Sequence, residues 1–104
     1  MNRHYDCVLT VALPARLEDD FIDLALAHPE WVDGFSLAHQ EGFGSGASLV
    51  SPMERVRGRA RRAVLTVLME SQHVELLLQE LRTAFPTPEI LWWTMPVTAF
   101  GRFA

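Results

Sequence analysis

The chain has 104 residues, of which 49% are hydrophobic and 21% charged, a composition typical of a folded domain and not of a disordered segment. Its 13 acidic residues outnumber its 9 basic residues, all of which are arginine, and the net charge of -4 speaks against a general nucleic-acid binder. No apolar run approaches the roughly 18 to 20 residues that cross a bilayer, so we expect no membrane-spanning segment. We expect one domain, residues 1–104, because the chain is too short for two.

The only cysteine, Cys7, cannot form an internal disulfide, which fits a reducing compartment. Arg3 and the apolar residues 7–13 loosely imitate a short signal peptide, but Asp6 interrupts the start of the apolar region. We therefore expect a cytoplasmic protein.

The N-terminal part of the chain predicts a strand, a helix and a second strand. Residues 5–13 are rich in β-branched and aliphatic side chains, which favour a strand. Residues 16–28 repeat apolar side chains at helical spacing, with three acidic residues near the start, and Pro29 ends this helix. Residues 35–39 predict a weaker strand.

Residues 40–52 predict a long loop, because they contain three glycines, three serines and a proline but few large apolar side chains. Loops of this length in compact domains usually act as lids, binding loops or docking segments. A flexible connection without a function is the alternative. The residues that we expect to contact a partner protein here are Glu41, Gly42, Phe43, Gly44 and Gly46.

The C-terminal part predicts a strand over residues 59–69, a helix with Ser71 as its N-cap that ends before Pro86, and a last strand over residues 90–97. The order strand, helix, strand, strand, helix, strand is that of the ferredoxin-like βαββαβ fold. We therefore predict an α+β protein, with two helices on one face of a four-stranded antiparallel sheet.

The predicted strands are apolar on both faces. In residues 7–12 and 64–69, side chains of both alternating sets are largely apolar, and Trp92 and Trp93 project to opposite sides of their strand. A contiguous apolar patch marks an interface, so we expect a homo-oligomer whose sheets face one another. The alternative is a monomer that tolerates small apolar side chains on a solvent-facing sheet.

Five arginines fall within eight positions, residues 55–62. Guanidinium groups fork onto phosphate or carboxylate oxygens, and a glycine among them allows a ligand to approach closely. Arg61 and Arg62, deeper in the strand, are expected to be structural, with one of them paired to an acidic residue. The alternative for the whole cluster is a role in balancing acidic neighbours or protecting a sheet edge. The residues that we expect to bind a small anionic ligand are Arg55, Arg57, Gly58 and Arg59.

The histidines and Cys7 are scattered along the chain and show no metal-ligand spacing. His39, at the end of the second strand beside the glycine-rich loop, is the best-placed histidine for a metal ion, with Glu41 as a second candidate ligand and Cys7 as a further one. An exposed histidine without a ligand is the alternative. No nucleophile elbow, Walker loop or dinucleotide fingerprint is present, so we expect no catalytic activity.

Several segments resemble a family of small PII-like proteins, and the resemblance spans nearly the whole chain. They are residues 17–23 (Leu-Glu-Asp-Asp-Phe-Ile-Asp), the glycine-rich loop, residues 54–59 (Glu-Arg-Val-Arg-Gly-Arg), residues 92–97 (Trp-Trp-Thr-Met-Pro-Val) and Gly101-Arg102. This family of the PII-like superfamily is often encoded near heavy-metal efflux systems. The resemblance implies a trimer of ferredoxin-like subunits whose long loop meets a partner.

The resemblance does not extend to the ATP site of PII signal proteins, because residues 83–89 contain neither lysine nor arginine. Members of that family tend to carry a histidine in the glycine-rich loop, where this sequence has Phe43. We therefore predict a non-enzymatic, trimeric regulatory protein that binds a small ligand and presents residues 40–52 to a membrane transporter or other protein. The alternatives are a metal-binding accessory protein with a site near His39, and a small enzyme acting on an anionic substrate through the arginine cluster.

Overall fold

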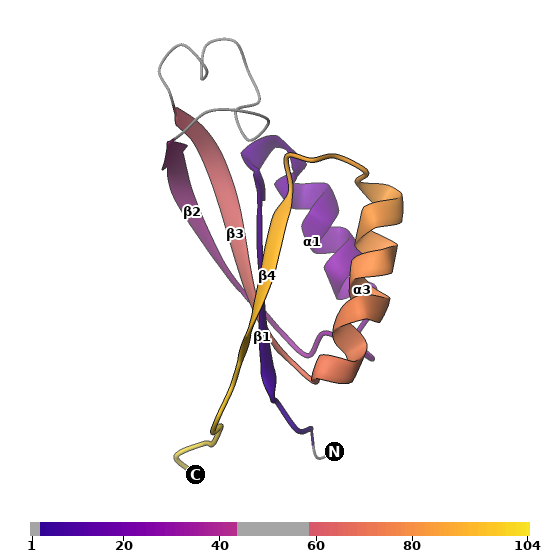
Figure 1. Ribbon diagram of the computed structural model, residues 1–104, viewed down its shortest axis with the longest axis vertical. Helices are drawn as coiled ribbons and strands as arrows, with labels where there is room; N and C mark the ends of the chain where they lie inside the picture. The colour runs from indigo at the N-terminus through magenta and orange to yellow at the C-terminus, as the bar shows by residue number, and fades with distance from the viewer. Residues whose placement is uncertain (1–2, 44–58) are drawn as a thin grey trace.

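The computed structural model describes residues 3–43 and 59–104 of the chain. In these ranges, two helices cover one face of a four-stranded antiparallel sheet (Figure 1). The strand order β2-β3-β1-β4 confirms the predicted ferredoxin-like fold. The elements are β1 (Cys7–Pro14), the short 3-10 helix η1 (Ala15–Leu17), α1 (Glu18–Leu26), β2 (Ser36–Phe43), β3 (Arg59–Met69), α3 (Ser71–Ala84) and β4 (Leu91–Pro96).

The core lies between the sheet and the two helices. Because side chains alternate along a strand, every second residue of β1 from Cys7 to Leu13, and of β3 from Ala63 to Met69, points toward the helices and is buried. Burial of each large apolar side chain there contributes about 1.5 to 3 kcal/mol. The largest fully buried side chains are Phe21, Leu9, Leu13, Leu65, Met69 and Leu77.

Strand β2 is longer than the sequence predicts. It continues through Phe43, because residues 40–43 pair with residues 59–62 of β3. The prediction that Glu41, Gly42 and Phe43 belong to the loop is therefore wrong, since cross-strand pairing outweighs their weak strand propensity. Gly44 and Gly46, the other two expected partner-contacting residues, lie outside the described residues.

The start of helix α3 is capped by a side chain from the segment before β1. Asp6 Oδ1 accepts a hydrogen bond from the Ser71 backbone N–H (2.8 Å), and Asp6 Oδ2 accepts one from the Ser71 hydroxyl (2.7 Å). Ser71 is therefore the first helical residue and not the predicted N-cap, a position that Glu70 occupies in an extended conformation. These hydrogen bonds to the charged carboxylate hold the pKa of Asp6 below its ordinary value.

Replacing Asp6 should destabilise the protein in a pH-dependent way. Because the pKa of Asp6 is lower in the folded than in the unfolded chain, its stabilisation is present above the unfolded pKa and lost as the pH falls through the folded value. We expect Asp6→Ala to lower the thermal midpoint by a few degrees at neutral pH. This deficit should shrink in strong acid, as circular dichroism melts would show. The control Asp23→Ala removes an exposed carboxylate of α1 and should change little, whereas a deficit independent of pH would contradict the capping role.

Candidate functional site

A charged cleft of about 480 Å³ lies where β2 and β3 approach η1. The sequence builds it by strand alternation, since His39 and Glu41 occupy one face of β2 and Gln40 and Gly42 the other. Cross-strand pairing then sets Glu41 opposite Arg61. The cleft therefore gathers polar and charged side chains from the paired strands β2 and β3, and its lining residues are Ala15, His39, Gln40, Glu41, Arg61 and Arg62.

One acidic group beside the cleft is bound to a histidine. His39 Nε2 lies 2.5 Å from Glu18 Oε1, where Glu18 is the first residue of α1. The η1 turn brings this end of α1 back against β2. The His39 side chain is nevertheless 64% exposed, so its ring borders the cleft as well as contacting Glu18.

This arrangement adds little support to the predicted metal site at His39. Among the residues that the structure describes, no group of three or more histidine, cysteine, aspartate or glutamate side chains could hold a metal ion. Cys7, the further candidate ligand, lies six residues along β1 from Leu13, which shares a row of the sheet with His39. At about 3.3 Å per residue, this places Cys7 roughly 20 Å from His39. Cys7 is therefore not a ligand of a site at His39, and burial raises the pKa of its thiol.

Gly42 gives the Arg62 side chain the room that it occupies. A Cβ atom on Gly42 would lie 2.7 Å from Arg62 Nε and 3.0 Å from Arg62 Cδ, so a side chain at this position would force the Arg62 side chain to move. The absence of a side chain at Gly42 thus allows the guanidinium stem to lie across β2. The sequence predicts Gly42 as a loop residue, but it serves as a strand residue that positions an arginine.

The cleft offers two guanidinium groups to an anion. Arg61 is exposed and Arg62 half-buried, and the fixed fork of each group suits a carboxylate or phosphate. Both residues were expected to be structural, and the signal that could have placed them in a cleft is the extension of β2 opposite them. Of the predicted anion ligands, Arg55, Arg57 and Gly58 lie outside the described residues, while Arg59 begins β3 opposite Phe43.

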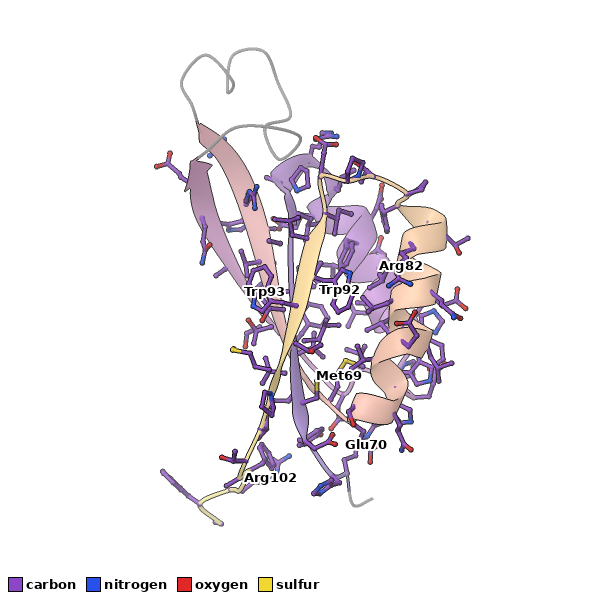
Figure 2. The ribbon with its side chains drawn as sticks, viewed as in Figure 1. Met69, Glu70, Arg82, Trp92, Trp93 and Arg102 are labelled. Atoms are coloured by element: carbon purple, nitrogen blue, oxygen red, sulfur yellow. The ribbon has the colours of Figure 1, made fainter. Side chains whose placement is uncertain are left out.

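The sheet face that the helices leave uncovered is apolar. Trp93 projects to this face and Trp92 to the helix side, as Figure 2 shows. Trp93 is 44% exposed and Met95 54% exposed. We call this surface the open face, and its residues on β1, β3 and β4 are Val8, Thr10, Ala12, Val64, Thr66, Leu68, Leu91, Trp93 and Met95.

No helix within residues 3–43 and 59–104 combines the length and apolar character needed to cross a membrane.

The chain has the fold of PII-like proteins and of CutA1. It is similar to CPII, a nitrogen regulatory PII-like protein from Thiomonas intermedia K12 bound to ADP, AMP and bicarbonate. The match covers 98% of this chain and 100% of that one, with a TM-score of 0.70 and 14% identity. It also matches CutA1 from Pyrococcus horikoshii over 93% of this chain and 88% of that one, with a TM-score of 0.70 and 8% identity. At such identities the likeness concerns the fold alone.

The chain belongs to the DUF3240 family, described as proteins of unknown function, whose model matches residues 4–104. A crystal structure of a DUF3240 family protein from Shewanella baltica OS155 matches with a TM-score of 0.76 and 20% identity, over 97% of this chain and 99% of that one. No curated protein sequence matches the chain. The prediction of an uncharacterised family with a PII-like fold is thus confirmed.

Proposed function

We propose that the protein is a non-enzymatic, cytoplasmic PII-like regulator that assembles as a homotrimer and binds a small anionic ligand. The observation that carries the proposal is the cleft at the end of β2 and β3 in a PII-like fold, which Arg61 and Arg62 line, with Arg62 against Gly42 and Arg61 opposite Glu41. Two guanidinium groups at one cleft are suited to binding an anion and transmitting its presence to neighbouring residues. Glu18 of α1 contacts His39, and Glu41, the carboxylate that lines the cleft, lies opposite Arg61.

The likeness to CPII supports an anionic ligand, because ADP, AMP and bicarbonate are all anions. Arg55, Arg57, Gly58 and Arg59 belong to the same proposal, since Arg59 leads directly into the strand that carries Arg61.

The open face supports the trimer. It presents apolar side chains of three strands to solvent in the single chain, and covering them with the sheets of neighbouring copies would remove this surface from water. In the same proposal, residues 40–52 meet a partner protein, and the resemblance described above suggests a heavy-metal efflux transporter. Residues 40–43 of that segment extend β2, so their part of the contact with the partner would have a fixed orientation relative to the sheet.

Calorimetric titration with ADP, AMP, bicarbonate and inorganic phosphate would test the anion site. We expect Arg62→Ala to weaken anion binding about tenfold or more. We expect the same of the double variant in which Arg57 and Arg59 are both replaced by alanine. Each charge-assisted hydrogen bond lost costs about 1.5 to 3 kcal/mol. Affinity should also fall with added salt, because exposed charges are screened within about 8 to 10 Å.

The matched control is Arg102→Ala, which removes an exposed guanidinium from the C-terminal tail and should leave affinity unchanged. Melting temperature and mass, measured on each variant, separate loss of binding from loss of structure. If the wild type binds none of the four anions, or if the arginine variants bind them as the wild type does, the anion site is wrong.

A further inference from the structure

A second cavity, of about 230 Å³, lies on the helix side of the sheet between α3, the segment after α3, and β4. It is distinct from the charged cleft, with which it shares no residue. Most of its lining residues are apolar, with Arg82 and Thr87 as the polar ones, which favours a ligand that carries an apolar group. The apolar residues that shape it include Val11, Phe21, Leu81, Phe85, Ile90 and Trp92.

One positively charged side chain, that of Arg82, also lines this cavity. Figure 2 shows Trp92 projecting from β4 toward α3, where Arg82 lies. The Arg82 guanidinium carbon lies 5.9 Å from the centroid of the Trp92 ring, within the range of a cation–π contact. Arg82 Nη1 donates to Glu75 Oε1 at 2.9 Å, and the two side chains are 52% and 62% exposed. A pair so exposed is weak, so a ligand carboxylate can compete for the guanidinium.

The wall opposite α3 is held in place by polar contacts outside the cavity. The Glu89 backbone N–H donates to Thr87 Oγ1, which in turn donates to Glu89 Oε1, both at 3.2 Å. The same carboxylate pairs with Arg16 Nη2 at 2.6 Å, which balances its negative charge. On the inner side, the rings of Phe21 and Phe85 pack with their centroids 5.4 Å apart. The cavity is therefore built before any ligand arrives.

We propose that this cavity binds a small organic acid made of one apolar ring and one carboxylate. The ring would pack among the apolar side chains and against Trp92. The carboxylate would accept hydrogen bonds from the Arg82 guanidinium. The volume admits one ring and excludes a nucleotide-sized ligand, since drug-sized ligands need pockets of about 300 Å³ or more. The site goes beyond the anion binding proposed above and does not require it. It lies on the helix side of the sheet, opposite the open face.

Proton–nitrogen NMR titrations of the labelled full chain, with phenylacetate as the probe, would test the site. We expect the indole N–H signal of Trp92 to shift and that of Trp93 to stay, with the two signals assigned from the variants Trp92→Phe and Trp93→Phe. Phenylacetamide, a neutral molecule of the same shape, should bind about tenfold more weakly. Arg82→Gln should abolish this preference for the acid, and Arg102→Gln should preserve it.

Arg82 is exposed, so Arg82→Gln should fold as the wild type does. If phenylacetate at millimolar concentrations shifts no indole signal, or if it shifts that of Trp93 alone, the cavity is not its site. Equal binding of the acid and the amide by the wild type would overturn the role of Arg82. Failure of adenine nucleotides to bind the charged cleft would leave this result unaffected, because the two sites share no residue.

Discussion

Thr66→Asp should convert the proposed trimer into monomers without unfolding the chain. Thr66 lies at the centre of the open face, opposite Thr10 and Ser36 in the sheet, and is exposed in the single chain. An aspartate there remains hydrated in the monomer but loses its water when the sheets meet, at a cost of several kcal/mol. Since about 2.7 kcal/mol corresponds to a hundredfold change in a dissociation constant, assembly should be lost at micromolar concentrations.

Light scattering and circular dichroism on the same sample separate the two effects of this substitution. The matched control is Gln79→Asp, which adds the same charge to an exposed position of α3 on the other side of the molecule. The control should keep the mass of the wild type. If Thr66→Asp keeps that mass as well, the open face is not the interface between copies.

Leu9→Ala should destabilise the fold more than any other substitution considered. Leu9 is fully buried at the centre of β1, between Val67 of β3 and Thr94 of β4. Truncating a buried leucine to alanine removes transfer free energy and leaves a cavity, which together cost about 2 to 5 kcal/mol. Small domains have a free energy of unfolding of about 5 to 15 kcal/mol, so this loss is a large share of the total.

Chemical denaturation would measure the loss, with Leu76→Ala as the matched control. Leu76 lies on α3 and is 45% exposed, so the same truncation there should change the free energy of unfolding by about 0.5 kcal/mol or less. Equal losses for the two leucine variants would contradict the assignment of the core to the space between sheet and helices.

The sequence predicts most of the fold, because its periodic patterns coincide with what is buried. Strand β3 begins and ends where the alternation of apolar residues predicts, at Arg59 and Met69. Helix α1 is shorter than predicted, since its first turn is the 3-10 helix η1 and it ends at Leu26. Such ends depend on local hydrogen bonds and not on periodicity.

The cap of α3 and the length of β2 could not be predicted in the same way. The Asp6 carboxylate reaches Ser71 across 65 residues of sequence, and no local motif indicates such a contact. Residues 40–43 look like a loop because of their composition, and only the pairing with β3 makes them a strand. In both cases the deciding contact comes from a part of the chain that is distant in sequence.

The candidate site was predicted only in part. His39 and Glu41 were singled out, and both line the charged cleft. The contact of His39 with Glu18 of α1 and the role of Gly42 beside Arg62 depend on the turn of η1 and on strand register. No pattern in the sequence indicates the second cavity, because Arg82 and Trp92 belong to different elements and come together only in the folded chain.

The mass of the wild-type protein in solution tests the account most directly, because the open face, the subunit assembly and the regulatory role all depend on it. One chain has a mass of 11.8 kDa. Light scattering at micromolar concentrations should give a single species of about 35 kDa, three times that mass. A single species of 11.8 kDa under the same conditions would contradict the account, since the open face would then be exposed to water in the functional protein.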